Sequence, residues 1–139
     1  MKLIIAGSRE FSDYQYLTGY VSTMPPWIAE PTEIVSGCAA GADTLGEKYA
    51  QKHGLRVKLF PANWARHQRA AGPIRNEEMA VYADGLIAFW DGKSRGTAHM
   101  IQSMKNKKKL AYVVRTDIEW CKQMNKGFPV LNNVEIYNA

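Results

Sequence analysis

Residues 85–97 read GLIAFWDGKSRGT, and they are the strongest indication of the fold class in this sequence. Its first six residues are almost all apolar, which is typical of a strand buried on both faces of a sheet. Segment 91–97 contains two glycines and predicts a loop at the carboxyl end of that strand. Strands of this kind occur in parallel sheets covered by helices on each side, so the stretch predicts an α/β domain.

Two further segments repeat this pattern of a strand followed by a loop. Residues 3–6 are an apolar run that ends in Gly-Ser-Arg at 7–9. Residues 33–35 are a short run that ends in the glycine-rich loop 36–43. The other two predicted strands are residues 55–60 and 110–114.

Helices are expected between these strands. They are predicted over residues 14–24, 44–53, 74–82 and 98–106. Asp43 is predicted to cap the second helix and Gly54 to end it, while Pro73 suits the first position of the third. The pair Pro25 and Pro26 is predicted to end the first helix. Strands that alternate with single helices predict a Rossmann-like, doubly wound parallel sheet with helices on both faces.

The chain has 139 residues, which fits one domain. We expect a core over residues 1–114 and a less regular extension over 115–139. In the extension, residues 118–124 suggest a short helix, and residues 130–137 suggest a strand or a hairpin interrupted at 132–133. A hydrophobic content of 46% with 22% charged residues is typical of an ordered globular protein.

The sequence predicts a cytoplasmic location. The amino-terminal apolar run is too short for a signal peptide, and no segment approaches the roughly 18 apolar residues that cross a bilayer. Cys38 and Cys121 lack C-x-x-C spacing, so we expect reduced thiols and neither a disulfide nor a zinc site. We expect no metal, no cofactor and no membrane partner.

The chain carries a formal net charge of +5. Four lysines cluster at the expected end of a helix: Lys105, Lys107, Lys108 and Lys109. Cations favour the carboxyl end of a helix dipole, so a solvated helix end is the preferred interpretation. A nucleic-acid patch stays open as the alternative, because clustered lysines also bind phosphate backbones.

The three glycine-containing loops are expected to lie at one edge of the sheet, because the carboxyl ends of parallel strands meet there. Glycine lets the backbone approach a ligand, and amide groups at a helix start favour an anion. The chain lacks the Walker and G-x-G-x-x-G motifs, so a phosphate cradle here is of another kind. The predicted ligand-binding residues in this region are Gly7, Ser8, Arg9, Ser36, Gly37, Gly41, Asp43, Asp91, Ser94, Gly96 and Thr97.

Four residues between the loop at 36–43 and the loop at 91–97 extend this candidate set. Arg75 is predicted in the first turn of a helix, where a cation opposes the dipole unless it meets an anion. Asn76 is next to it. Trp64 and His67 lie in the preceding loop, where an aromatic ring can stack on a base. Trp90 ends an apolar strand and is expected in the core.

Cys38 has two interpretations. At a strand-to-helix turn it is a candidate nucleophile activated by a helix amino terminus. A small apolar filler is the preferred interpretation, because the sequence assigns it no partner base.

Four motifs in this order resemble one known family. They are Gly7-Ser8-Arg9 with Phe11 and Asp13; Val35-Ser36-Gly37 with Gly41-Ala42-Asp43; Ala71-Gly72-Pro73 with Arg75-Asn76 and Met79; and Ala88-Phe89-Trp90-Asp91-Gly92 with Ser94, Gly96 and Thr97. Over residues 1–114 they resemble the YspA-like, YpsA-related branch of the SLOG superfamily. That superfamily includes LOG phosphoribohydrolases, the DNA-processing protein DprA and sensor domains for nucleotide-derived signals.

The resemblance implies a Rossmann-type nucleotide-binding fold and a homo-oligomer. Small proteins of this family are frequent in phages, so the resemblance also suggests that a phage encodes this chain. The pair Gly96-Thr97 resembles the phosphate-binding turn of LOG enzymes, and Arg75 with Met79 resembles their Arg-x-x-x-Met helix. LOG enzymes have a glutamate where this chain has Met100. Many relatives also have a glycine where it has Cys38.

Three functions follow from these observations. The preferred one is binding of a nucleotide or nucleotide-derived molecule of the ADP-ribose type, as a sensor or sequestering protein. The second is a phosphoribohydrolase or N-glycosidase acting on a nucleoside monophosphate, for which Asp43 and Asp91 are the weak catalytic candidates. The third is a DprA-like DNA-handling protein, suggested by charge and resemblance alone.

Overall fold

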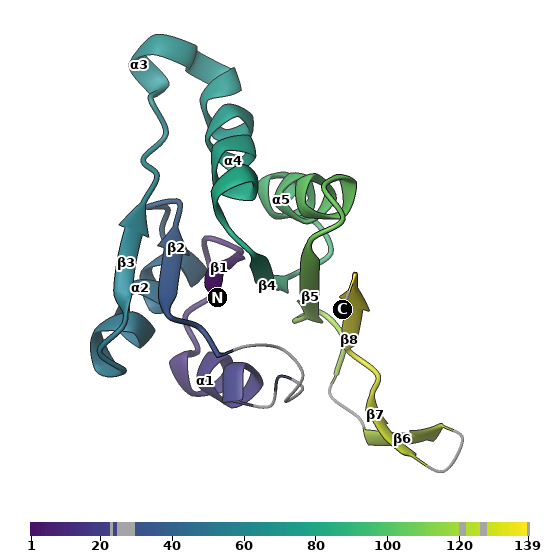
Figure 1. Cartoon of the computed structure of the whole chain (residues 1–139). Coiled ribbons are helices and arrows are strands. Elements are labelled where there is room, and N and C mark those ends of the chain that lie inside the picture. Colours follow the sequence, from purple (N-terminus) through teal and green to yellow (C-terminus); the bar gives the residue numbers. More distant parts are fainter. Residues whose placement is uncertain (23, 25–29, 120–121, 126–127, 139) are drawn as a thin grey trace.

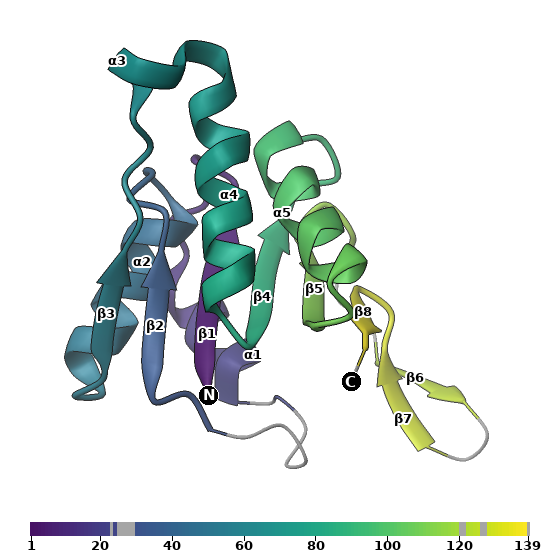
Figure 2. The ribbon, with the colours of Figure 1, turned by 45° about the horizontal axis from the view of Figure 1, so that its top comes forward.

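The computed structural model describes residues 1–22, 24, 30–119, 122–125 and 128–138. Its main sheet has six strands in the order β3-β2-β1-β4-β5-β8 (Figures 1 and 2). The first five run parallel, and β8 pairs with β5 antiparallel. This arrangement confirms the predicted Rossmann-like fold. A strand or hairpin was expected over 130–137, but the antiparallel pairing of β8 with β5 was not predicted. The strands of the sheet are β1 (Lys2–Gly7), β2 (Glu33–Ser36), β3 (Arg56–Leu59), β4 (Gly85–Trp90), β5 (Leu110–Arg115) and β8 (Val134–Tyr137).

Helices cover both faces of the sheet. Figure 1 shows α4 and α5 on one side and α1 on the other. The helices are α1 (Tyr14–Ser22), α2 (Ala42–Lys52), α3 (Trp64–His67), the 3-10 turn η1 (Gln68–Ala70), α4 (Ala71–Tyr82) and α5 (Arg95–Asn106). None of the described helices is long and apolar enough to cross a membrane.

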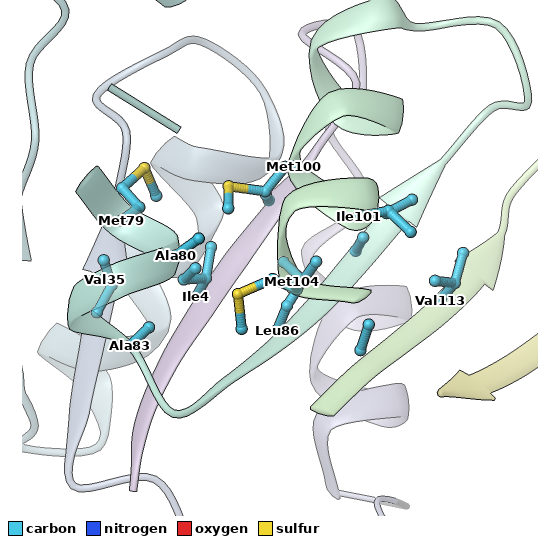
Figure 3. Packing of buried hydrophobic residues seen from close by; sticks show 13 residues of the cluster. Ile4, Val35, Met79, Ala80, Ala83, Leu86, Met100, Ile101, Met104 and Val113 are labelled. Atoms are coloured by element: carbon cyan, nitrogen blue, oxygen red, sulfur yellow. The ribbon is translucent and has the colours of Figure 1, made fainter. Parts of the chain in front are cut away.

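Alternate residues of β1 supply two separate hydrophobic clusters. Ile4 packs with Met79, Met100 and Met104 on the face covered by α4 and α5 (Figure 3). Leu3 and Ile5 face the opposite side and pack with residues of α1 and α2. A central strand that is apolar on both faces therefore builds the core of both layers, as expected for a parallel sheet.

The helices predicted over residues 74–82 and 98–106 each begin three residues earlier in the structure, α4 at Ala71 and α5 at Arg95. Helix α4 starts at Ala71, so Pro73 takes the third position and not the first. Proline is tolerated there because the first amide groups of a helix have no intrahelical acceptor. Segment 64–70, predicted as a loop, forms α3 and η1, and the Asn63 side chain accepts the Arg66 amide at 3.0 Å.

Asp43 does not occupy the predicted capping position. Helix α2 begins at Ala42 after Gly41, and the Asp43 carboxylate accepts the amide of Ala39 instead, at 3.1 Å. At the other end of α2, Gly54 has a φ of +66°, which confirms its predicted role as the terminator. The predicted end of α1 at residues 25–26 lies outside the described residues.

The expectation of a short helix over 118–124 is wrong. Strands β6 (Lys122–Asn125) and β7 (Phe128–Leu131) pair as a small antiparallel sheet that projects from the main one (Figures 1 and 2). The predicted interruption at 132–133 separates β7 from β8. The carbonyl of Asn133 accepts the amide of Arg115 at 2.7 Å, and its side chain donates to Tyr20. These contacts bring β8 back to the edge of the main sheet.

Trp90 was expected in the core, and the structure shows it only partly buried at the margin of the core. It packs against the hydrophobic cluster that contains Ile4 and Met79, which we call the α4–α5 cluster. Its indole N–H donates to the carbonyl of Ser94 at 3.1 Å. The Arg115 guanidinium lies 5.0 Å from the ring centroid. Trp90 therefore joins the end of β4 to the loop that precedes α5.

Candidate functional site

A cavity of about 390 Å³ opens at the carboxyl edge of the sheet, between the loops that follow β1, β2 and β4. We call it the main cavity. It is lined by Ala6, Gly7, Ser8, Arg9, Glu10, Gly37, Ala39, Asp43, Arg75, Asn76, Met79, Asp91, Ser94, Arg95, Gly96, Thr97 and Met100. The strand order reverses between β1 and β4, and this is where doubly wound proteins hold their ligands. Its volume lies within the range of small-molecule sites.

Arg75 links the β2 loop to the helices across the cavity. One guanidinium nitrogen donates to the carbonyl of Gly37, and Nε donates to Oδ1 of Asn76 at 3.0 Å. The Asn76 amide in turn donates to the carbonyl of Gly96 at 3.2 Å. This chain of contacts fixes the positions of the β2 loop, α4 and the start of α5 relative to one another.

The amino terminus of α5 opens onto the main cavity. Gly96 and Thr97 lie in its first turn and not in the predicted loop. A Cβ added at Gly96 would meet no atom of the described residues within 4 Å beyond its chain neighbours and its own helix backbone. The start of α5 therefore leaves space for another group to approach the backbone closely.

Asp91 has a structural role in the loop before α5. Its carboxylate accepts the amides of Lys93 and Ser94, at 2.9 and 2.7 Å, and the Ser94 hydroxyl at 3.0 Å. These hydrogen bonds hold the pKa of Asp91 below its usual value. Asp91 is therefore ionised at neutral pH, and its oxygens are occupied by the turn that positions α5.

Asp43 is the buried carboxylate of the main cavity, with 7% of its surface exposed. Burial raises its pKa from the usual 3.8 to about 6, while the Ala39 amide and Arg75 oppose that rise. A carboxyl group with a pKa near neutrality can donate or accept a proton at physiological pH. Among the lining residues, Asp43 is therefore best suited to acid–base chemistry.

The raised pKa of Asp43 makes a prediction about stability. Its contribution is fully present below pH 3.8 and is lost as pH rises through about 6, because the folded state binds the proton more tightly. The expected loss is about 3 kcal/mol. We expect the Asp43→Asn variant to gain stability relative to the wild type between pH 4 and pH 7, as measured by urea denaturation. A difference that stays constant across this range would contradict the assignment.

A second cavity of about 310 Å³ adjoins the first. It is lined by Arg9, Gly37, Cys38, Ala39, Ala40, Pro61, Ala62, Trp64 and Arg75. Four of these residues also line the main cavity: Arg9, Gly37, Ala39 and Arg75. Trp64 is thus brought to the edge of the site, although it lies outside the main cavity.

Three predicted site residues line neither cavity. Ser36 is buried, where its hydroxyl donates to Glu47 at 2.8 Å and accepts the amide of Cys38. Gly41 packs against the backbone of the loop after β1, and a Cβ there would lie 2.3 Å from the Ser8 carbonyl oxygen. His67 lies on α3 and lines neither cavity. The other twelve predicted residues line one or both cavities.

Cys38 is exposed, so its interpretation as an apolar filler is wrong. It follows the last residues of β2, where the chain leaves the sheet with a left-handed φ of +63°. Partial desolvation and the Glu47 carboxylate raise the pKa of its thiol. This shift is opposite to that of an activated nucleophile. Cys121 lies outside the described residues.

Several lining residues were missed in the sequence. Arg95 and Glu10 flank predicted site residues in their loops, and proximity to Gly96 and Arg9 was the available signal. Met100 lines the main cavity although it is 2% exposed and packs in the α4–α5 cluster. Across the described part of the chain, His, Cys, Asp and Glu form no group of three that could hold a metal ion.

Two comparisons with known proteins show the family of the chain. Residues 1–67 match the family model described as the YspA, cpYpsA-related SLOG family. The chain is also similar to the Gene 61 protein of Mycobacterium phage D29, with 32% identity over 111 residues, which cover 73% of this chain and 86% of the relative. The resemblance led us to expect such small proteins in phages, and this relative is one. The chain belongs to the YspA, cpYpsA-related SLOG family.

Proposed function

We propose that this protein binds a nucleotide or nucleotide-derived molecule of the ADP-ribose type and acts as a sensor or sequestering protein. Membership of the SLOG family indicates nucleotide-related binding or processing. The observation that best supports binding is the open start of α5 at Gly96, with Arg75 lining the same cavity. Helix amides and a guanidinium group are the groups that proteins use to hold phosphate.

The charges of the main cavity support a ligand that is more than a bare anion. Three arginines line it: Arg9, Arg75 and Arg95. Three carboxyl groups line it as well: Glu10, Asp43 and Asp91, of which Asp91 is already engaged by its own turn. Arginines suit phosphate oxygens, whereas carboxylates accept hydrogen bonds from sugar hydroxyls. A phosphorylated sugar or nucleotide satisfies both.

The test of this proposal is to identify the ligand. Native mass spectrometry of the protein purified from cells is expected to show a mass shift from a co-purified small molecule. Calorimetric titration with AMP, ADP and ADP-ribose then compares candidate ligands directly. The proposal fails if the purified protein carries no small molecule and binds none of these probes.

Removing Arg75 provides a quantitative prediction. We expect Arg75→Ala to weaken binding of AMP or ADP-ribose by about 1.5 to 3 kcal/mol, because a charged hydrogen bond to phosphate is lost. Arg66→Ala is the matched control, since Arg66 lies on α3 and lines neither cavity. Calorimetry is the measurement. Equal affinities of Arg75→Ala and wild type would remove Arg75 from the site.

A phosphoribohydrolase is the second candidate function, and the raised pKa of Asp43 favours it. Breaking an N-glycosidic bond builds positive charge on the ribose, which a carboxylate can stabilise. Met100 supplies neither charge nor a proton acceptor at the position where LOG enzymes have glutamate.

We therefore expect no efficient hydrolysis. Incubation with AMP or ADP-ribose, followed by chromatography, is expected to release no free base above the uncatalysed level. Multiple turnovers that disappear in Asp43→Asn or Asp91→Asn would replace the binding proposal with an enzymatic one.

The cluster of lysines gives little support to a DprA-like role. Lys107 pairs with Glu77, and the Lys109 ammonium donates to three carbonyls at the end of α4. These contacts favour the helix-end interpretation over a nucleic-acid patch. We also propose a homo-oligomer, on the resemblance to LOG proteins, which light scattering in solution can test.

A further inference from the structure

The main and second cavities differ in chemistry. The main cavity is lined by hydroxyl, amide and carboxylate groups from Ser8, Asp43, Asn76 and Thr97 among others. The lining of the second cavity has no carboxylate among the described residues, and it places three alanines, a proline and the indole of Trp64 beside Arg9 and Arg75. The first suits a sugar or phosphate, whereas the second suits a flat apolar group.

Two cations mark the junction of the cavities. Arg9 and Arg75 line both of them, together with backbone of the β2 loop. The Arg75 guanidinium is held there by the carbonyl of Gly37 and by Asn76. A ligand that extends from one cavity into the other must therefore pass two positive charges, which suits a ligand that carries a phosphate group.

Trp64 has no role in the hydrophobic core that accounts for its position. It belongs to neither buried cluster of the described residues, and 52% of its surface is exposed. Its ring rests near Gly72, where an added Cβ would lie 3.6 Å from Cη2. The capped turn at Asn63 fixes the start of α3. An indole that lines a cavity and is half exposed can serve as a platform for stacking.

We propose that the second cavity is the base subsite, so that the ligand is a nucleotide whose base stacks on Trp64. Its ribose crosses the junction beside Arg9, and its phosphate enters the main cavity between Arg75 and the start of α5. This arrangement spreads the ligand along the carboxyl edge of the sheet, from the ends of β2 and β3 to the point where the strand order reverses. The inference rests on the proposed function and deepens it.

The experiment compares a probe that has a base with one that lacks it. AMP and ADP-ribose carry adenine, whereas ribose 5-phosphate has no base. We expect Trp64→Ala to weaken the two adenine probes about 10- to 100-fold in calorimetry, because stacking is lost. Binding of ribose 5-phosphate, followed by NMR titration, is expected to change less than about twofold, because its contacts lie outside the stacking surface.

Two further variants serve as controls. Trp64→Phe keeps an aromatic face and is expected to retain affinity for AMP within about fivefold of the wild type. Val81→Ala removes an apolar side chain that is 69% exposed on α4 and lines neither cavity, so it is expected to leave both probes unaffected.

The outcomes separate the two proposals. Unchanged AMP affinity in Trp64→Ala, together with loss of binding in Gly96→Val, overturns the base subsite and leaves the proposed function standing. Equal weakening of AMP and ribose 5-phosphate also overturns it, because Trp64 would then act only by supporting the site. A change of oligomeric state with unchanged AMP affinity assigns Trp64 to a protein interface instead. If the wild type binds no adenine probe, the base subsite fails, and the proposed function fails with it when the purified protein also carries no small molecule.

Discussion

Replacing Gly96 with valine is expected to weaken nucleotide binding at least about 100-fold, because the new side chain occupies the space where a phosphate would approach the start of α5. The change adds two methyl groups beyond the Cβ to a position that is exposed in the unliganded protein. A Cβ at Gly96 meets no described atom within 4 Å outside its own helix and its neighbours. The collision is therefore expected with the bound ligand, because the protein leaves space around a Cβ there. Calorimetry with AMP and ADP-ribose measures it.

The same substitution is expected to leave the fold intact. Urea denaturation should show a change of less than about 1 kcal/mol, since glycine and valine differ little in helix propensity. Gly96→Ala forms an intermediate step, with a smaller loss of affinity. Gly19→Ala is the matched control, because it also adds a methyl group to a helix position that is free of described contacts within 4 Å. Wild-type affinity in Gly96→Val would show that no ligand approaches α5 closely.

Replacing Gly41 with alanine is expected to destabilise the protein by about 3 to 5 kcal/mol, since backbone strain and a steric clash coincide there. Gly41 has φ +78° and ψ −124°, a conformation that side chains with a Cβ rarely adopt. An added Cβ would also lie 2.3 Å from the carbonyl oxygen of Ser8 and 2.5 Å from that of Arg9. Because both partners are backbone atoms, the loop after β1 would have to move.

Two other glycines separate the causes of this effect. Gly54 has a φ of +66° but no described contact within 4 Å of an added Cβ, so Gly54→Ala should cost only about 1 kcal/mol from strain. Gly19 has neither feature, and alanine there should stabilise α1 by about 0.5 to 1 kcal/mol. Urea denaturation of the three variants is the measurement. A Gly41→Ala variant as stable as Gly54→Ala would show that the loop after β1 yields without cost.

These predictions rest on features that the sequence predicted to different degrees. The bounds of β4 at Gly85–Trp90 agree with the prediction, and each of the other four core strands differs by one residue at one or both ends. Apolar runs bounded by glycine or proline encode buried strands locally, which is why this part was predictable. The starts of the helices were harder to predict. Helices α4 and α5 each begin three residues before the predicted start, because the first-turn amides of a helix need no intrahelical partner and tolerate proline or glycine.

The Rossmann-like fold and most of the residues around the main cavity were predictable from the chain alone, since residues at the carboxyl ends of parallel strands must share one edge. Only the tertiary structure placed Arg75 against Gly37, 38 positions away, and buried Asp43 enough to raise its pKa to about 6. It also turned β8 back as an antiparallel edge strand and set Trp64 beside a second cavity. Contacts between distant residues depend on how whole elements pack, and no local pattern in the chain encodes that packing.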